Sequence, residues 1–365
     1  MTFRIAILGG YGNFGGYIAR ALAPDPNIAL TICGRNLAKA EAFVTDLNAA
    51  IPASAALVDI DHLGSSLRDI APDLVLHTVG PFQGQDYRVA RAAIEAGAHY
   101  CDLADARQFV CEIGELDGLA KEKSVAAIAG ASSVPCLTGA YLDEASKVMN
   151  ITEVDYGISA AQQTNRGLGT VAAILSYVGK PFTRLKNGAM RRVFGWQGLH
   201  SHVYPQLGRR WFGYCDVPDF DLFPARYPSL KSHRFAAGHE TLPLHFGTWL
   251  LSWGVRLRLL PQLSAWSNWL LRLSFLFDWM GSDESGFHMF IKGYDNDGAP
   301  VERRHYIIAR EGHGPNIPCT PAIVIARKLA RGEALEPGAR ACVGIVSLDE
   351  LREALAPFNL EWIDQ

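Results

Sequence analysis

The sequence predicts an α/β fold for the first third of the chain and an α+β fold for most of the rest. The first 130 residues alternate short apolar runs with stretches of helical periodicity, which is typical of parallel strands joined by helices. After about residue 130 this alternation stops, and strand-like segments with a hairpin signal follow. The chain has 365 residues, of which 49% are hydrophobic, so it is long enough for two domains with substantial cores.

Six apolar runs in the first domain have the length of buried strands. They are Phe3–Leu8, Ile28–Cys33, Ala55–Ile60, Leu74–Val79, Ala98–Cys101 and Val125–Ala129. Four segments have helical periodicity, namely Gly15–Leu22, Leu37–Leu47, Tyr87–Ala96 and Phe109–Lys121. Six parallel strands with helices on both faces make a complete Rossmann domain, a doubly wound parallel sheet. We therefore expect a Rossmann domain over residues 1–130.

Residues 131–318 are expected to form an α+β domain with a mainly antiparallel sheet. The strand-like segments are Val154–Ala160, Met190–Phe194, Leu199–Tyr204, Phe287–Gly293 and Val301–Arg310. The last two flank Asp295-Asn296-Asp297-Gly298, and an Asp-Gly step suits a hairpin turn.

The end of the chain, residues 319–365, is expected to form helices that return to the Rossmann domain. Gly314–Pro318 is interpreted as a rigid loop, followed by Thr320 as the cap and Pro321 as the first residue of a helix over Ala322–Ala330. Ser347-Leu348-Asp349-Glu350 has the pattern of a capping box before a last short helix.

A hydrophobic insert over 244–280 interrupts the second domain. It holds Trp249, Trp253, Trp266, Trp269 and Trp279. Its arginines and Pro261 leave no apolar run of about 18 residues, so a membrane-spanning helix is not expected. Three interpretations stay open: a cover over a large apolar substrate, a contact in a helical core or homodimer, or a contact with a membrane surface. The core or dimer contact is the simplest of the three.

Composition excludes several classes of function. The net charge of −3 gives no basic excess for nucleic acid, so no such partner is expected. The seven cysteines are scattered without a C-x-x-C pair, which predicts neither a disulfide framework nor a metal site. Free thiols and the lack of a leader-like N-terminus lead us to expect a cytoplasmic protein, with membrane association as the alternative that the insert leaves open.

The turn after the first predicted strand has the spacing of a dinucleotide-binding turn. It reads Gly10-Tyr11-Gly12-Asn13-Phe14-Gly15 and fits G-x-G-x-x-G between a strand and a helix. Gly10 would permit the tight turn, Gly12 the approach of a pyrophosphate, and Gly15 close packing of helix on strand. The alternative is a glycine-rich turn without a ligand.

The second predicted strand indicates which dinucleotide is preferred. Enzymes that use NAD place an acidic residue near its end, whereas this sequence has Gly34, Arg35 and Asn36 there. A guanidinium suits the 2′-phosphate of NADP, so we expect NADP(H), although Arg35 could also be a solvated surface residue. Asp59, after the third strand, would border the adenine or simply end the strand.

From the fourth strand onward the sequence resembles the saccharopine dehydrogenase-like family. The resemblance rests on Gly80-Pro81-Phe82, on Ala96-Gly97-Ala98-His99-Tyr100-Cys101-Asp102, on Gly130–Pro135 and on Gly314–Pro318. It implies a Rossmann domain joined to an α+β domain, a small-molecule substrate in a cleft between them, reduction of an imine with NADPH, and a homodimer. The insert departs from the family's amino-acid enzymes, which puts an amino-acid substrate in doubt.

Candidate residues for chemistry lie after the fourth and fifth strands. Gly80, Pro81 and Phe82 are expected to flank the nicotinamide, because ligands bind past the carboxyl ends of such strands. Asp102 is the family-matched acid and is expected to bind a substrate amine or hold a general acid, with a loop cap as the alternative. The proton donor stays open among Arg166, His239, His245, His288, Lys292, His305 and Tyr306, whereas His77 is interpreted as a core histidine.

The sequence therefore predicts an NADP(H)-dependent oxidoreductase that transfers a hydride to or from an imine or carbonyl. Two alternatives are kept. One is a peripheral membrane reductase with a lipid-like substrate, which the insert suggests. The other is a nucleotide-binding sensor or scaffold without catalysis, which the lack of an obvious proton donor suggests.

Overall fold

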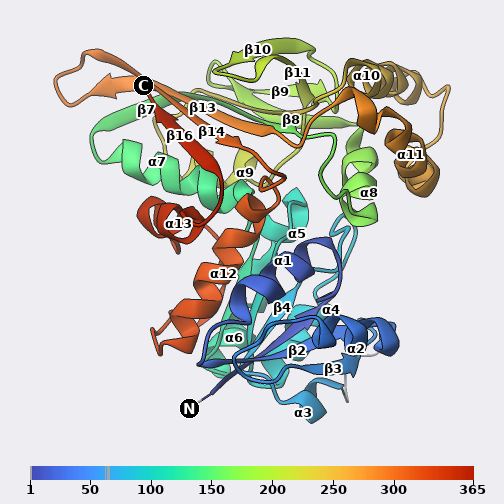
Figure 1. Ribbon diagram of the computed structural model, residues 1–365. Coiled ribbons are helices and arrows are strands. Elements are labelled where there is room, and N and C mark those ends of the chain that lie inside the picture. The colour runs from blue at the N-terminus through green and yellow to red at the C-terminus, as the bar shows by residue number, and fades with distance from the viewer. Residues whose placement is uncertain (1, 62, 64–65) are drawn as a thin grey trace. The chain divides into compact units, whose positions relative to one another are not determined.

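The structure is a computed structural model that describes residues 2–61, 63 and 66–365 (Figure 1). The chain divides into two compact units. The first comprises Met1–Leu137 and Asn316–Ala354, and the second comprises Thr138–Pro315 and Leu355–Gln365. The predicted division at residues 130 and 318 differs from this one at the end of the chain, where the last eleven residues join the second unit rather than the first.

The first unit is built on a parallel sheet. Its spatial order is β15-β6-β5-β4-β1-β2-β3, and every pairing in it is parallel. The strands are β1 (Phe3–Leu8), β2 (Ile28–Gly34), β3 (Ser54–Leu57), β4 (Leu74–His77), β5 (His99–Asp102), β6 (Ala126–Ala129) and β15 (Gly338–Ala341). The six strands expected from the sequence are present, and the predicted doubly wound fold is confirmed. The central strands are apolar along almost their whole length because helices cover both faces of such a sheet.

Helices connect these strands. They are α1 (Asn13–Leu22), α2 (Leu37–Thr45), α3 (Ser66–Ile70), α4 (Arg88–Glu95), α5 (Arg107–Cys111), the 3₁₀ helix η1 (Ile113–Leu116), α6 (Asp117–Glu122), the helical turn η2 (Ser133–Leu137), α12 (Asn316–Ala330) and α13 (Leu348–Leu355). In α1 the buried side includes Ile18, Ala19 and Leu22, and the helix packs against α12 from the far end of the chain (Figure 1).

Two helix predictions need correction. The single helix expected over Phe109–Lys121 is three short ones, α5, η1 and α6, and Gly114 and Gly118 lower helix propensity across that region. The helix expected from Ala322 starts already at Asn316, and the Thr320 hydroxyl donates to the Asn316 carbonyl oxygen instead of capping the helix. Pro318 fits because it lies in the first turn, where a missing N–H costs no hydrogen bond.

The second unit is built on a seven-stranded sheet in the order β10-β11-β12-β7-β13-β14-β16. Only β12 and β7 pair in parallel, so the expected mainly antiparallel sheet is confirmed. Its strands are β7 (Met149–Ala160), β10 (His200–Tyr204), β11 (Gly208–Tyr214), β12 (Ser232–His239), β13 (Ser285–Asp295), β14 (Pro300–Ala309) and β16 (Leu360–Asp364). A separate hairpin pairs β8 (Pro181–Lys186) with β9 (Ala189–Phe194).

Two features near the end of the chain bear on the predicted turns. Gly298, with a φ of +82°, closes the predicted β13–β14 hairpin by donating to the Asp295 carbonyl oxygen. Ser347 and Glu350 form the predicted capping box at α13, because the Ser347 N–H and hydroxyl bond the Glu350 carboxylate and the Glu350 N–H bonds the Ser347 hydroxyl. The chain then enters β16, which pairs with β14, so not all of 319–365 is helix.

The helices of the second unit are α7 (Thr138–Ser146), α8 (Leu168–Tyr177) and α9 (Asp219–Arg226), followed by those of the insert. The insert lies between β12 and β13 and is helical, as α10 (Leu242–Arg256), η3 (Leu263–Trp266), α11 (Ser267–Ser274) and η4 (Phe275–Met280). No helix within 2–61, 63 and 66–365 is long and apolar enough to cross a membrane.

One part of the insert packs in a core, because Leu263 is buried in a hydrophobic cluster against which Trp249, Leu251, Val255 and Leu270 pack. Nine other large hydrophobic side chains of the insert are exposed. Trp269 is 62% exposed and Trp279 is 80% exposed. We call the exposed apolar side chains of residues 257–280 the insert patch. It consists of Leu257, Leu259, Trp266, Trp269, Phe275, Leu276, Trp279 and Met280.

A buried acid lies beneath the second sheet. Asp219 on α9 is fully buried and accepts hydrogen bonds from the Thr138 hydroxyl at 2.7 Å and the Tyr156 hydroxyl at 2.5 Å. The His233 imidazole bonds the same Tyr156 hydroxyl at 2.9 Å. Burial raises the pKa of Asp219 to about 7, although the two hydroxyl donors lower it in part.

This raised pKa predicts a pH dependence of stability. Between the ordinary carboxyl pKa and about 7 the folded chain binds more protons than the unfolded one, so the free energy of unfolding falls as pH rises through this range. We expect Asp219→Asn to flatten that slope between about pH 4 and 7, since an amide oxygen still accepts both hydroxyls. Urea unfolding at several pH values measures it, with Asp221→Asn, on the same helix, as the control. An unchanged slope in Asp219→Asn would contradict the assignment.

Candidate nucleotide-binding site

The turn between β1 and α1 is shaped by close approaches that only glycine permits. Gly9 has a φ of +77°, and the Gly12 N–H donates to the Gly9 carbonyl oxygen at 2.8 Å. A Cβ on Gly10 would lie 3.0 Å from the Ile7 carbonyl oxygen. The residue with left-handed backbone in this turn is therefore Gly9 and not Gly10. Gly10 is favoured for a different reason, because a Cβ there would crowd the Ile7 carbonyl oxygen. The Gly9-Gly10 pair was the signal for this in the sequence.

Gly15 brings helix α1 against this turn. A Cβ there would lie 2.2 Å from the Gly9 carbonyl oxygen and 2.8 Å from the Thr78 hydroxyl. That hydroxyl donates to the Leu8 carbonyl oxygen at 2.8 Å, which ties the end of β4 to the end of β1. Sequence reasoning missed Thr78, because a threonine after a strand carries no signature of its own.

The start of α1 has the features of a phosphate-binding site. Gly12 precedes the helix in extended conformation and is exposed, and within the described chain no side chain caps this end. A Cβ on Gly12 would meet the Gly9 carbonyl oxygen at 2.9 Å. The first N–H groups of a helix have no acceptor inside it, and they favour an anion. Tyr11, Asn13 and Phe14, which complete the motif, are half-buried around this position.

The end of β2 lies beside the same turn. The Tyr11 ring occupies the space over Gly34, where a Cβ would lie 2.4 Å from the ring. The Asn36 N–H donates to the Tyr11 hydroxyl at 3.1 Å, and the Asn36 side chain caps α2 by accepting from the Lys39 N–H at 3.0 Å. Arg35, between them, is exposed. The structure thus places Tyr11 against Gly34 and Asn36, and the binding of a dinucleotide by these residues and Arg35 stays a prediction.

Asp59 lies two residues past β3, which ends at Leu57 rather than at the predicted Ile60. Its carboxylate accepts from the Asp61 N–H at 3.1 Å. The Val58 N–H donates to the Gly34 carbonyl oxygen at 3.1 Å, so this segment continues next to the end of β2. A contact between Asp59 and adenine stays a prediction.

The loop after β4 carries Gly80, Pro81 and Phe82, and the Gly80–Pro81 peptide is cis. Gly80 and Pro81 are exposed, whereas Phe82 is buried with its ring 5.0 Å from that of His77 and 5.3 Å from that of Phe109. The Gln85 side-chain amide donates to the Val79 and Pro81 carbonyl oxygens at 2.8 and 2.7 Å, which fixes the loop.

Asp102 is fully buried at the end of β5 and holds the backbone that follows. One of its carboxylate oxygens accepts from the Gly130 N–H at 2.8 Å and from the Ala104 N–H at 2.9 Å. Burial raises the pKa of Asp102 to about 6, against these hydrogen bonds, which lower it. Gly130 has a φ of +77°, and a Cβ there would lie 2.8 Å from Pro135. These contacts favour the loop-cap interpretation, and a catalytic role stays a prediction.

His77, also at the end of β4, is buried and bonds the Tyr100 hydroxyl at 3.0 Å. Burial lowers the pKa of His77 to about 3, so the imidazole is neutral at physiological pH. This fits the predicted core histidine.

Three of the candidate proton donors of the second unit are held by structural contacts. His288 bonds the Tyr204 hydroxyl at 2.6 Å, His305 bonds the Asp364 carboxylate at 2.7 Å, and Arg166 pairs with Asp278 at 2.5 Å. Burial lowers the pKa of His239 to about 4 and that of His245 to about 3. Tyr306 is buried in a hydrophobic cluster.

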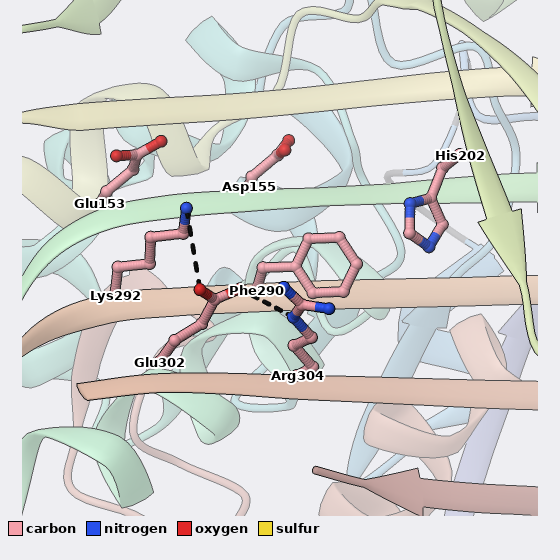
Figure 2. A pocket seen from close by; sticks show the side chains of 7 residues that line it. All are labelled: Glu153, Asp155, His202, Phe290, Lys292, Glu302 and Arg304. Atoms are coloured by element: carbon pink, nitrogen blue, oxygen red, sulfur yellow. Dashed lines mark hydrogen bonds and ion pairs between the residues drawn. The ribbon is translucent and has the colours of Figure 1, made fainter.

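Lys292 lines a polar pocket of about 240 Å³ on the second sheet, shown in Figure 2. The pocket is lined by Glu153, Asp155, His202, Phe290, Lys292, Glu302 and Arg304. Glu302 pairs with Lys292 at 3.9 Å and with Arg304 at 2.7 Å, as the dashed lines in Figure 2 mark. Asp155 pairs with Arg234. These charges largely neutralise one another, as expected on the polar face of an antiparallel sheet.

Comparison with known proteins agrees with this description. Residues 5–131 match the family described as Saccharopine dehydrogenase NADP binding domain. The structure is similar to that of saccharopine dehydrogenase (L-Glu forming) from Saccharomyces cerevisiae, with 13% identity, 100% of each chain covered and a TM-score of 0.67. It is also similar to homospermidine synthase from Legionella pneumophila in complex with NAD, with 10% identity, 100% of this chain and 92% of that one covered, and a TM-score of 0.61. A search of curated protein sequences finds no match.

The solved structures establish the fold, and the family match over residues 5–131 supports an oxidoreductase that depends on a nicotinamide dinucleotide. The match over residues 5–131 agrees with the resemblance to the saccharopine dehydrogenase-like family seen in the sequence.

The crowding at Gly12 gives a direct test of the site. We expect Gly12→Val to abolish nucleotide binding, because the side chain would meet the Gly9 carbonyl oxygen and occupy the approach of the pyrophosphate. Gly114→Val is the control, since the space around Gly114 is open and this residue is exposed. Fluorescence titration with NADPH measures both variants, and circular dichroism checks their folding. Retained affinity in a folded Gly12→Val would show that the turn is only structural.

Proposed function

We propose that this protein is an NADP(H)-dependent oxidoreductase that transfers a hydride to or from an imine or carbonyl carbon of a small-molecule substrate. The observation that carries the proposal is the turn Gly9–Gly15. Its glycines leave room for a pyrophosphate at the start of α1, next to a second strand that ends in Gly34 and an exposed Arg35.

Particular residues would hold each part of the cofactor. Gly10, Gly12 and the first turn of α1 would bind the pyrophosphate, Arg35 the 2′-phosphate and Asp59 the edge of the adenine. Gly80 and Pro81 would contact the nicotinamide, with Phe82 anchoring their loop in the core. When bound, the cofactor supplies or accepts the hydride, and the chain orients it.

Preference for NADP(H) over NAD(H) rests on the end of β2. An acidic side chain there would accept hydrogen bonds from the ribose 2′-hydroxyl and would repel a 2′-phosphate. This chain has Arg35 instead, and a guanidinium matches a phosphate with paired hydrogen bonds.

We expect Arg35→Ala to weaken NADPH binding by about ten- to a hundredfold, the range for losing a hydrogen bond to a charged group, and to change NADH binding little. Lys39→Ala is the matched control, because Lys39 is an exposed cation on the neighbouring helix α2. Titrations with both nucleotides measure the change. Equal losses for NADPH and NADH would rule out the assignment of Arg35 to the 2′-phosphate.

The same titration on the unmodified protein separates an enzyme from a sensor. Binding of NADPH should be followed by a screen of imines, ketones and enoyl lipids for loss of the reduced-nicotinamide absorbance. Binding without turnover on any of them would favour a nucleotide sensor. Failure to bind either nucleotide would overturn the proposed function.

The role of Asp102 is tested by a pair of variants. We expect Asp102→Asn to keep turnover within a few-fold, because an amide oxygen still accepts from the Gly130 and Ala104 N–H groups. Asp102→Ala should lower the free energy of unfolding by about 1–3 kcal/mol, since it leaves both donors buried without an acceptor. Turnover and urea unfolding measure the two effects. A loss of turnover by orders of magnitude in a stable Asp102→Asn would establish the carboxyl group as catalytic.

A further inference from the structure

Exposed apolar side chains concentrate in one short segment of the second unit. Among the described residues, 17 large hydrophobic side chains are exposed, and eight of them form the insert patch within the 24 residues 257–280. Leu257 and Leu259 precede η3, and the other patch residues lie on η3, α11 and η4. Single exposed hydrophobic residues are ordinary, whereas a concentration of this kind marks a surface that meets an apolar partner.

One side of the insert packs against the second unit, and the other side is exposed. Leu263 is buried in a cluster with Leu175, Val178 and Trp196, and Leu270 of α11 packs against the same cluster. On α11 the exposed side chains include Trp269 and Arg272, and on η4 they include Leu276 and Trp279. The side of the insert that does not meet the cluster therefore exposes large apolar rings and chains beside an arginine.

The charge of the insert is mainly positive. Residues 244–280 contain Arg256, Arg258 and Arg272 and one acid, Asp278, whereas the whole chain has a net charge of −3. The insert is therefore +2, and the remainder of the chain is −5. Asp278 is already paired with Arg166 and accepts from the Gln162 amide.

We propose that the insert patch docks on the surface of a lipid bilayer that contains anionic lipids. Tryptophan rings prefer the headgroup region, leucine and phenylalanine enter the acyl boundary, and arginine binds lipid phosphate. The docked segment lies on the membrane surface, because no helix among the described residues is long and apolar enough to cross it.

The excess of positive charge favours this occupant over a second copy of the chain. A two-fold symmetric dimer through the insert patch would place the same surface on both partners. Arg258 and Arg272 would then enter the interface from both copies, while the one acid of residues 257–280, Asp278, is already paired with Arg166. An anionic bilayer instead provides an apolar acyl region for the hydrophobic side chains and negatively charged headgroups for the arginines.

The test is flotation of the full chain with vesicles of phosphatidylcholine alone or with about one-third phosphatidylserine. We expect the protein to float with the anionic vesicles and much less with neutral ones. Each arginine near the surface contributes roughly fivefold to the partition coefficient, so Arg258→Gln/Arg272→Gln should weaken binding by more than tenfold. Added salt should weaken it as well.

A second variant isolates the aromatic contribution. Trp269→Ser/Trp279→Ser should lose at least tenfold in partitioning, because both rings are more than half exposed and their removal leaves no cavity. Tyr294→Ser, on an exposed aromatic of β13 outside the insert, is the control and should float like the unmodified protein. Brominated lipids should quench the fluorescence of the unmodified protein more than that of the Trp269→Ser/Trp279→Ser variant.

Two results would overturn the proposal. One is no flotation of the unmodified protein with anionic vesicles, and the other is equal flotation of the tryptophan variant. Self-association that Trp269→Ser/Trp279→Ser abolishes, seen by light scattering without any flotation, would assign the patch to a homodimer instead. Titration with NADPH runs in parallel on each variant, so a failure of membrane docking is distinguished from a failure of nucleotide binding.

Discussion

The distance between the first turn of α1 and the preceding glycine turn is the constraint on which the first unit depends. With no side chain on Gly15, the helix backbone lies against the Gly9 carbonyl oxygen, closer than a Cβ would allow. Thr78 fills the remaining space and ties β4 to β1 through the Leu8 carbonyl oxygen. One close approach therefore sets the direction of α1, the position of its first N–H groups and the start of the loop that carries Gly80 and Pro81.

How well the sequence predicts each element follows from how that element is stabilised. The strands β1, β2, β4 and β6 are apolar over nearly their whole length, since both faces are buried, and such runs are recognisable without a structure. β15 reads Gly338-Ala339-Arg340-Ala341 and has no such run. Its place is fixed by pairing with β6 and by the Ala339 N–H donating to the Asp117 carboxylate at 3.1 Å, contacts between distant parts of the chain. β16, likewise, is a strand because its backbone pairs with the edge of β14.

In the candidate site, too, some features are recognisable from the local sequence and others depend on contacts between distant residues. The spacing of Gly10, Gly12 and Gly15 is visible in the sequence because a Cβ at any of these positions would be too close to a neighbouring atom. The contact of Tyr11 with Gly34 and the bond from Thr78 to Leu8 depend on which strands are neighbours, so spacing alone cannot show them. Asp102 illustrates a further difficulty. An acid after a strand has the same sequence signature whether it faces a ligand or, as here, accepts from the Gly130 and Ala104 N–H groups.

The route of the chain through the two units has a consequence for how the protein is made. The backbone passes from one unit to the other after Leu137, again after Pro315 and once more after Ala354. β15 and β16 are edge strands of different sheets, and both lie in the last 28 residues. During synthesis, neither sheet is complete until β15 and β16 have been made, so β6 and β14 present unpaired edges until then. A nascent chain of this protein therefore exposes two unpaired strand edges at the same time, and either edge can pair with a wrong strand. We expect it to need chaperones for longer than a protein whose domains fold one after the other.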